Sequence, residues 1–154
     1  MACSQSLLQH QTFLQQALPR SSLLGSLPPN LIELLSGLVE SAAAFAPGQT
    51  IVREGGQSRG LHVVRSGSCR VLVGTPQGPL LVATVEQGEV FGEMSLFSRT
   101  RNASVVAGEH GCEVLSIALF GMSLLMDIPA MRSAVLRRVA RNRERLAVTA
   151  TKLH

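Results

Sequence analysis

The spacing of apolar residues changes twice along the chain, which predicts a β region between two helical ends. Apolar positions within residues 7–18 recur at helical spacing, so we expect an amphipathic helix that ends before Pro19. A proline-containing break follows at residues 26–30. Beyond it we predict a second amphipathic helix, whose apolar stripe consists of Leu31, Leu34, Leu35 and Leu38.

Residues 42–118 instead carry short alternating runs of apolar and polar residues, separated by turn-forming residues about every 8–12 positions. Candidate strands include residues 62–65, 69–73, 80–85, 103–107 and 112–117. The breaks lie at residues 47–48, 55–56, 66–67, 76–78, 87–88 and 108–111. Roughly eight strands fit, so we predict a mainly β domain with flanking α elements, folded as an eight-stranded β jelly roll, or double-stranded β-helix.

The helical period returns after residue 118. A short helix is expected over residues 119–126, ending near Pro129. A longer helix follows, with a narrow stripe formed by Met131, Val135, Val139, Asn142 and Leu146. This stripe is shorter than the roughly three or four heptads that a coiled coil needs. The pattern therefore leaves open both a monomer and a homodimer through the C-terminal helix.

Length and charge refine this picture. The chain of 154 residues fits one domain, and its apolar content of 45%, with no Trp or Tyr, indicates an aliphatic core. We divide it into an N-terminal helical extension (residues 1–22), a central domain (residues 23–145) and a basic tail (residues 146–154). Half of the 14 Lys and Arg residues follow residue 130. Such charge can attract nucleic acid, acidic lipid or protein, but a solvated helix face is the favoured interpretation.

Several functional classes lack their sequence signatures. The three cysteines are widely spaced, which argues against a disulfide framework or a zinc site, and Cys69 and Cys112 suit buried strand positions. No signal peptide or membrane span is expected, and a reducing cytoplasm fits best. No arrangement of nucleophile, base and acid indicates an enzyme. We also expect no metal and no cofactor.

Residues 91–105, which read FGEMSLFSRTRNASV, carry the strongest chemical signal. A helical turn over residues 93–96 would direct free backbone N–H groups at an anion, and Gly92 would allow close approach. Arg101 offers a planar, charged fork for phosphate oxygens. Glu93 accepts hydrogen bonds and so suits a sugar hydroxyl. These groups neutralise about one charge, which implies a phosphodiester monoanion with a free ribose hydroxyl.

This segment resembles the phosphate-binding cassette of the cyclic nucleotide-binding domain family, found in catabolite activator proteins, cyclic-nucleotide-dependent kinases and cyclic-nucleotide-gated channels. The resemblance covers roughly residues 23–145, because residues 45–48 (FAPG), 51–55 (IVREG) and 61–67 (LHVVRSG) also match the family's first strands. It implies a ligand that is cAMP or cGMP, without choosing between them. It also implies C-terminal helices that close over the purine as a lid.

The resemblance assigns roles to individual residues. Gly92 and the backbone of Met94 and Ser95 would hold phosphate, Glu93 the 2′-hydroxyl, and Arg101 the exocyclic phosphate oxygen. The resemblance also implies local contacts from Asn102 and Ala103, and a purine lid arginine among Arg138, Arg141 and Arg143.

The chain departs from the family pattern at two places. The loop at residues 97–101 is about one residue shorter than usual, which brings Arg99 into competition with Arg101. Arg101 is preferred because residues 102–105 (NASV) follow it as Ala-Ala-Thr-Val does in the family. Asn102 stands where the family generally has a smaller residue, and its amide does not choose between adenine and guanine.

The leading hypothesis is a non-catalytic sensor that binds a cyclic nucleotide and signals to an effector protein through its C-terminal helices. An alternative is a degenerate domain that acts as a protein-interaction module. Another is the sensor part of a truncated DNA-binding regulator, channel or kinase. The chain as given should not read nucleic-acid sequence, because no helix-turn-helix follows the last helix.

Overall fold

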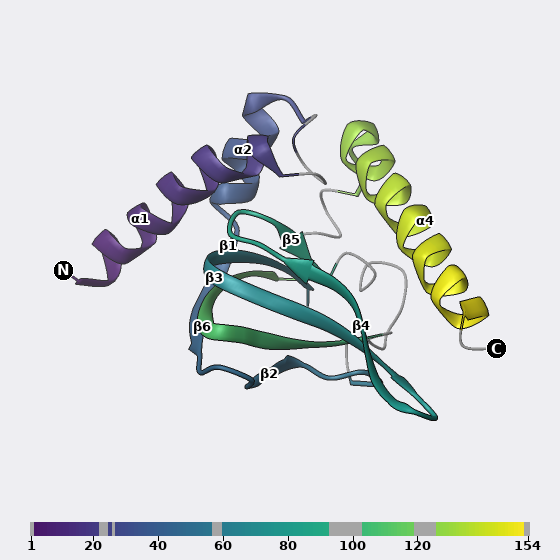
Figure 1. Cartoon of the computed structure of the whole chain (residues 1–154). Helices are drawn as coiled ribbons and strands as arrows, with labels where there is room; N and C mark the ends of the chain where they lie inside the picture. Colours follow the sequence, from purple (N-terminus) through teal and green to yellow (C-terminus); the bar gives the residue numbers. More distant parts are fainter. Residues whose placement is uncertain are drawn as a thin grey trace.

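The computed structural model describes residues 2–21, 25, 27–56, 60–92, 103–118 and 126–152. Its helical elements are α1 (Ala2–Ala17), η1 (Leu18–Arg20), α2 (Pro29–Ser36) and α4 (Pro129–Lys152). The strands are β1 (Val39–Phe45), β2 (Thr50–Val52), β3 (Gly60–Thr75), β4 (Gly78–Val85), β5 (Val90–Phe91) and β6 (Ser104–Ala118). Figure 1 shows α1 and α2 gathered at one end of the curved sheet, with α4 on another side.

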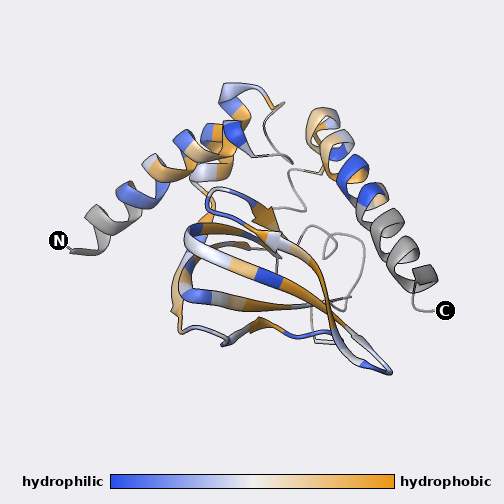
Figure 2. Cartoon of the chain, viewed as in Figure 1, coloured by the Kyte–Doolittle hydropathy of each residue, from blue (hydrophilic) through white to orange (hydrophobic). Residues whose placement is uncertain are grey.

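The strands form one antiparallel sheet in the order β1-β6-β3-β4, with β2 paired to β6 and β5 paired to β3. The prediction of a mainly β fold with flanking helices is therefore confirmed. Predicted turns at residues 76–78 and 87–88 are confirmed as well, and α1 ends before Pro19 as expected. Figure 2 shows hydrophobic and hydrophilic residues interspersed along the strands.

The described residues form six continuous strands where the sequence predicts about eight. Two predicted breaks, at residues 66–67 and 108–111, lie inside β3 and β6. The register of the β3–β6 pair shifts between Gly67 and Cys69, so the strands bend there without ending. Gly67 and Gly111 have φ values of 75° and 74°, a backbone region that glycine adopts without steric cost. Each long strand thus supplies two segments of the roll.

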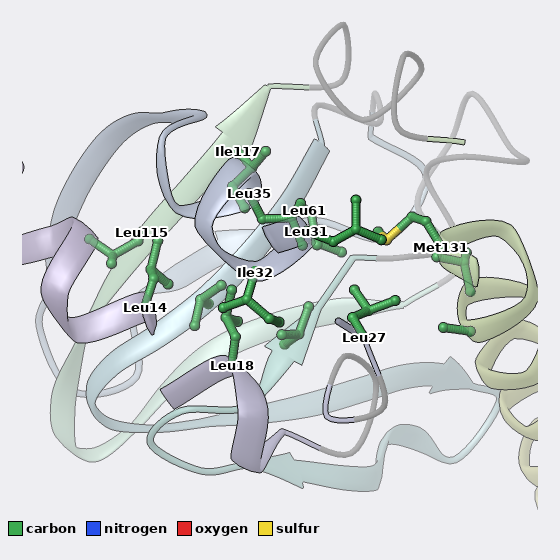
Figure 3. Close-up of a cluster of buried hydrophobic side chains, with 14 residues drawn as sticks. Leu14, Leu18, Leu27, Leu31, Ile32, Leu35, Leu61, Leu115, Ile117 and Met131 are labelled. Atoms are coloured by element: carbon green, nitrogen blue, oxygen red, sulfur yellow. The ribbon is translucent and has the colours of Figure 1, made fainter. Parts of the chain in front are cut away.

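One hydrophobic core lies between the helices and the sheet (Figure 3). We call it the helix-side cluster: Leu14, Leu18, Leu27, Leu31, Ile32, Leu35, Leu61, Val63, Val90, Leu115, Ile117, Met131, Ala134 and Val135. It joins α1, which lies in the predicted N-terminal extension, to strands of the central domain. Leu34, predicted on the apolar stripe of α2, is 48% exposed, and Ile32 is buried in its place. The buried face of α2 is therefore rotated from the predicted apolar stripe, because it includes Ile32 and leaves Leu34 exposed.

A second buried set, the strand-side cluster, is built from strands alone. Its members are Val64, Cys69, Val85, Phe91, Val105, Ala107, Cys112 and Val114. The half-buried side chains of Phe45, Ile51, Val52 and Val71 pack against it. Cys69 and Cys112 are thus buried strand residues, as expected. This cluster forms the interior of the roll.

Helix α4 begins with Pro129, whose fixed φ suits the first position of a helix. Met131, Ala134 and Val135 attach its first turns to the helix-side cluster. The helix continues through residue 146, where the sequence places the start of a basic tail. In the part of the chain that the structure describes, no helix is both long and apolar enough to cross a membrane. The predicted short helix at residues 119–126 lies almost wholly outside the described residues.

Candidate functional site

The predicted site is only partly within the described residues. Glu93, Met94, Ser95, Arg101 and Asn102 lie outside them, and the side chain of Arg143 does too. Their assigned roles stay predictions. The structure describes both ends of the cassette segment (residues 91–105), the strands that pair beside those ends, and the first half of α4.

The first end of the cassette segment is held by β5. Phe91 pairs with His62 and Val90 with Val63, and both β5 side chains are buried. The imidazole of His62 stacks on the Phe91 ring with centroids 5.0 Å apart, and its Nδ1 lies 2.8 Å from Ser116 Oγ. These contacts fix the strand that leads into the predicted phosphate site.

Gly92 follows β5 with a φ of 92°. Side chains with a Cβ rarely adopt this backbone region, so the position favours glycine for conformational reasons alone. A glycine also lets a ligand approach the backbone closely. The conformation therefore accounts for a glycine at this position, and the close approach of a ligand stays a prediction.

The second end of the cassette segment, at Ala103, leads into β6. Ser104 pairs with Leu72 of β3, and its Oγ accepts a 2.8 Å hydrogen bond from the Glu54 backbone N–H. The Glu54 carboxylate in turn accepts a 3.3 Å hydrogen bond from the Gly74 N–H. Strand β3 thus carries both ends of the segment, at His62 and at Leu72.

An apolar row crosses four strands at the second end of the cassette segment. Val105 pairs with Val52 on one side and with Val71 on the other, and Val71 pairs with Ala83. Directly paired residues lie on the same face of a sheet. Val105 is buried, whereas the other three are half-buried. We call these four residues the apolar row; it offers a nonpolar wall beside a segment rich in polar groups.

The lid candidates on α4 differ in their surroundings. Arg138 Nη2 lies 3.7 Å from Glu89 Oε2, and its side chain is only 14% exposed. Arg141 is exposed. Glu89, directly before β5, was not identified from the sequence; a single sequence gives no signal that pairs it with a residue so far along the chain. The Arg138–Glu89 pair thus connects α4 to the residues that directly precede Gly92 in the chain.

The described residues contain no cluster of three or more His, Cys, Asp or Glu side chains that could hold a metal ion. Cys69 and Cys112 are free thiols. Burial raises the pKa of the Cys69 thiol well above its usual range, and the adjacent Cys112 adds to the effect. A thiol held protonated in this way is a poor nucleophile, so Cys69 does not resemble a catalytic cysteine.

Comparisons with known proteins agree with the geometry. The model of the family described as "Cyclic nucleotide-binding domain" matches residues 43–127. Human cGMP-dependent protein kinase 2 is 30% identical over 112 residues, which is 71% of this chain and 14% of the kinase. The chain therefore spans about a seventh of the length of this curated relative.

Two solved structures have a similar fold. The catabolite activator protein of Thermus thermophilus is 26% identical with a TM-score of 0.69, over 86% of this chain and 62% of that one. The regulatory domain of Toxoplasma gondii PKA, crystallised with cAMP, is 21% identical with a TM-score of 0.67, over 74% of this chain and 43% of that one. At this identity the second likeness concerns the fold alone.

Proposed function

This chain belongs to the cyclic nucleotide-binding domain family, and from that premise we propose that it is a non-catalytic sensor that binds cAMP or cGMP. The observation that carries the proposal is the family match over residues 43–127, which includes the whole cassette segment. The conformation of Gly92 and the anchoring of both segment ends on β3 support it. In this proposal residues 23–145 form the binding domain.

The phosphate and ribose roles follow from residue chemistry. Arg101 forms charge-assisted hydrogen bonds to the exocyclic phosphate oxygen, while Gly92 and the Met94 and Ser95 amides hold the same group. Glu93 accepts a hydrogen bond from the ribose 2′-hydroxyl. Local contacts from Asn102 and Ala103 complete the set.

The base has two surfaces available to it. The apolar row supplies a nonpolar wall, and the wall's half-buried members keep apolar surface within reach of a ligand. An arginine of α4, from Arg138, Arg141 and Arg143, supplies a planar cation that stacks on the purine. Contact with a nonpolar wall and stacking on a guanidinium plane do not by themselves select adenine or guanine, so the proposal covers both nucleotides.

Signalling runs through α4. Arg138 contacts Glu89, and Glu89 leads through β5 into Gly92, so the position of α4 and the entry of the cassette are physically connected. A ligand shifts such an equilibrium only by its differential affinity for the two positions of the helix. Movement of the C-terminal helices on occupancy then passes to an effector protein, or to a second copy of the chain through α4.

Thermal denaturation with and without nucleotide tests the proposal. A ligand at about 100 times its Kd stabilises the folded state by about 2.7 kcal/mol, which for a chain of this size raises Tm by roughly 5–10 °C. We expect this rise with cAMP, cGMP or both. The matched control is 5′-AMP, which has the same base and ribose but an open, more highly charged phosphate. Equal Tm values in all samples would contradict cyclic nucleotide binding and favour a protein-interaction module.

A further inference from the structure

Strands β3 and β6 are antiparallel neighbours whose register shifts between Gly67 and Cys69, and we call this irregularity the β3–β6 bulge. A Cβ on Gly67 would overlap the carbonyl oxygen of Gly111, and one on Gly108 would lie 3.0 Å from the Ser68 carbonyl oxygen. Between the pairs Gly67↔Cys112 and Cys69↔Ala107, β6 contains more residues than β3, so its chain bends around the partner strand. The backbones of β3 and β6 are therefore held in close contact at this bulge.

The thiols of Cys69 and Cys112 meet at the β3–β6 bulge. Cys69 has no exposed surface and Cys112 is 7% exposed, and both belong to the strand-side cluster. Their sulfur atoms are 3.5 Å apart, with the Cys69 thiol donating to Cys112. A disulfide has a bond length of about 2.05 Å, so the sulfur atoms need to approach by only about 1.5 Å. Small side-chain rotations can supply such a movement.

We propose that Cys69 and Cys112 form a modification site: a small peroxide converts the two thiols into an intramolecular disulfide that joins β3 to β6. The proposal concerns the folded chain alone and does not depend on nucleotide binding. The irregular pairing of β3 with β6 brings the two sulfur atoms together, although 42 other residues separate them in the sequence.

The chemistry proceeds in two balanced steps. The Cys112 sulfur attacks one peroxide oxygen and loses its own proton; the O–O bond breaks, the sulfur becomes a sulfenic acid, and the departing hydroxide takes up that proton to leave as water. The Cys69 sulfur then attacks the sulfenic sulfur, its proton leaves with the hydroxyl group as a second water, and the S–S bond forms. Two thiols are oxidised and one peroxide is reduced to two waters.

The order of the steps follows from burial. Burial raises the pKa of the Cys69 thiol, which keeps this sulfur protonated and unreactive towards peroxide. Cys112 is the more exposed of the two, so it is the first to be oxidised. Access through so little exposed surface also selects small oxidants over protein disulfides.

A disulfide here would close a loop that contains β4, β5 and the whole cassette segment. Such a cross-link restricts the unfolded chain and so stabilises the folded one, with the benefit growing with loop length. For a loop of this size the chain-entropy relation gives about 4 kcal/mol, so we expect a rise in Tm of roughly 8–16 °C in the oxidised form.

The test uses a Cys3→Ser variant, which retains only these two cysteines. The folded protein is treated with hydrogen peroxide, digested with trypsin without reductant and analysed by mass spectrometry. We expect residues 66–70 to be joined to residues 102–132 with the loss of two hydrogens, together with the rise in Tm. Dithiothreitol should reverse both changes.

Cys3→Ser/Cys69→Ser and Cys3→Ser/Cys112→Ser serve as matched controls. Neither should show the joined peptides or a peroxide-dependent rise in Tm. The proposal is overturned if both thiols of the folded Cys3→Ser protein stay reduced under peroxide that oxidises the urea-unfolded chain. It is equally overturned if Cys112 proceeds to sulfinic acid without joining Cys69, or if the joined form has a lower Tm than the reduced form.

Discussion

The two buried clusters of this molecule differ in what builds them. The helix-side cluster combines α1, η1, α2 and α4 with strands, and its largest side chains, including Leu14, Leu35 and Leu115, have no exposed surface. The strand-side cluster contains only strand residues, most of them smaller, and half-buried side chains such as Val52 and Val71 pack at its rim. The comparison shows that most of the largest fully buried side chains lie in the helix-side cluster, under the helices.

The same two strands supply both clusters. Val63 and its partner Leu115 belong to the helix-side cluster, whereas the adjacent pair Val64 and Val114 belongs to the strand-side cluster. Successive side chains of a strand point to opposite faces, so each pair of neighbours serves both sides. A change on one face is therefore only one residue away from the other face.

The largest effect is expected for Leu35→Ala in the helix-side cluster. Leu35 has no exposed surface, so its truncation leaves a cavity and should lower the free energy of unfolding by about 2–5 kcal/mol. Leu34→Ala is the matched control, because Leu34 precedes it on α2 and is 48% exposed; its cost should stay within about 0.5 kcal/mol. Urea denaturation measures both. Similar costs for the two variants would contradict the assigned face of α2.

A smaller loss of stability, but a larger effect on ligand, is expected for Val105→Ala. Truncation of the Val105 side chain in the strand-side cluster should lower the free energy of unfolding by about 1–3 kcal/mol. Because Val105 lies in the apolar row, the variant should also bind cyclic nucleotide more weakly. Val106→Ala, on the opposite face of the same strand, controls for general damage to β6. Calorimetric titration measures the affinity for cyclic nucleotide. An equal loss of affinity in both variants would show that the apolar row is not part of the binding site.

Much of this architecture can be predicted from the sequence, because the alternating and helical periods reflect burial directly. The exceptions have physical causes. Residues 66–67 and 108–111 resemble strand ends because glycine and serine favour turns, yet long-range pairing keeps β3 and β6 continuous. Leu34 and Ile32 are both apolar, so hydrophobicity alone does not fix which one α2 buries.

The site divides in a similar way. Gly92 belongs to a local motif, and its φ of 92° accounts for a glycine at this position, while its role in phosphate binding stays a prediction. The Arg138–Glu89 pair depends on how α4 packs, which no local pattern encodes. Glu93 and Arg101 lie outside the described residues, so their roles remain predictions that binding experiments must decide.

The smallest effect on stability is expected for the contact between α4 and the approach to β5. Arg138→Ala should lower the free energy of unfolding by no more than about 1 kcal/mol, because the pair is long, at 3.7 Å, and the Glu89 side chain is 33% exposed. A double-mutant cycle with Glu89→Gln should give a coupling of about 0.2–1 kcal/mol. Arg137→Ala, an exposed neighbour on the same helix, should show no coupling to Glu89. Equal coupling at both positions would exclude a specific link.

The most direct test of the central claim is isothermal titration calorimetry of the Arg101→Ala variant with cAMP and cGMP, beside the original chain and Arg99→Ala. Loss of one charge-assisted phosphate contact should cost on the order of 1.5–3 kcal/mol, or about 10- to 150-fold in Kd. We predict this loss for Arg101→Ala and less than about a twofold change for Arg99→Ala. Unchanged affinity in Arg101→Ala, or no binding by the original chain, would contradict the account.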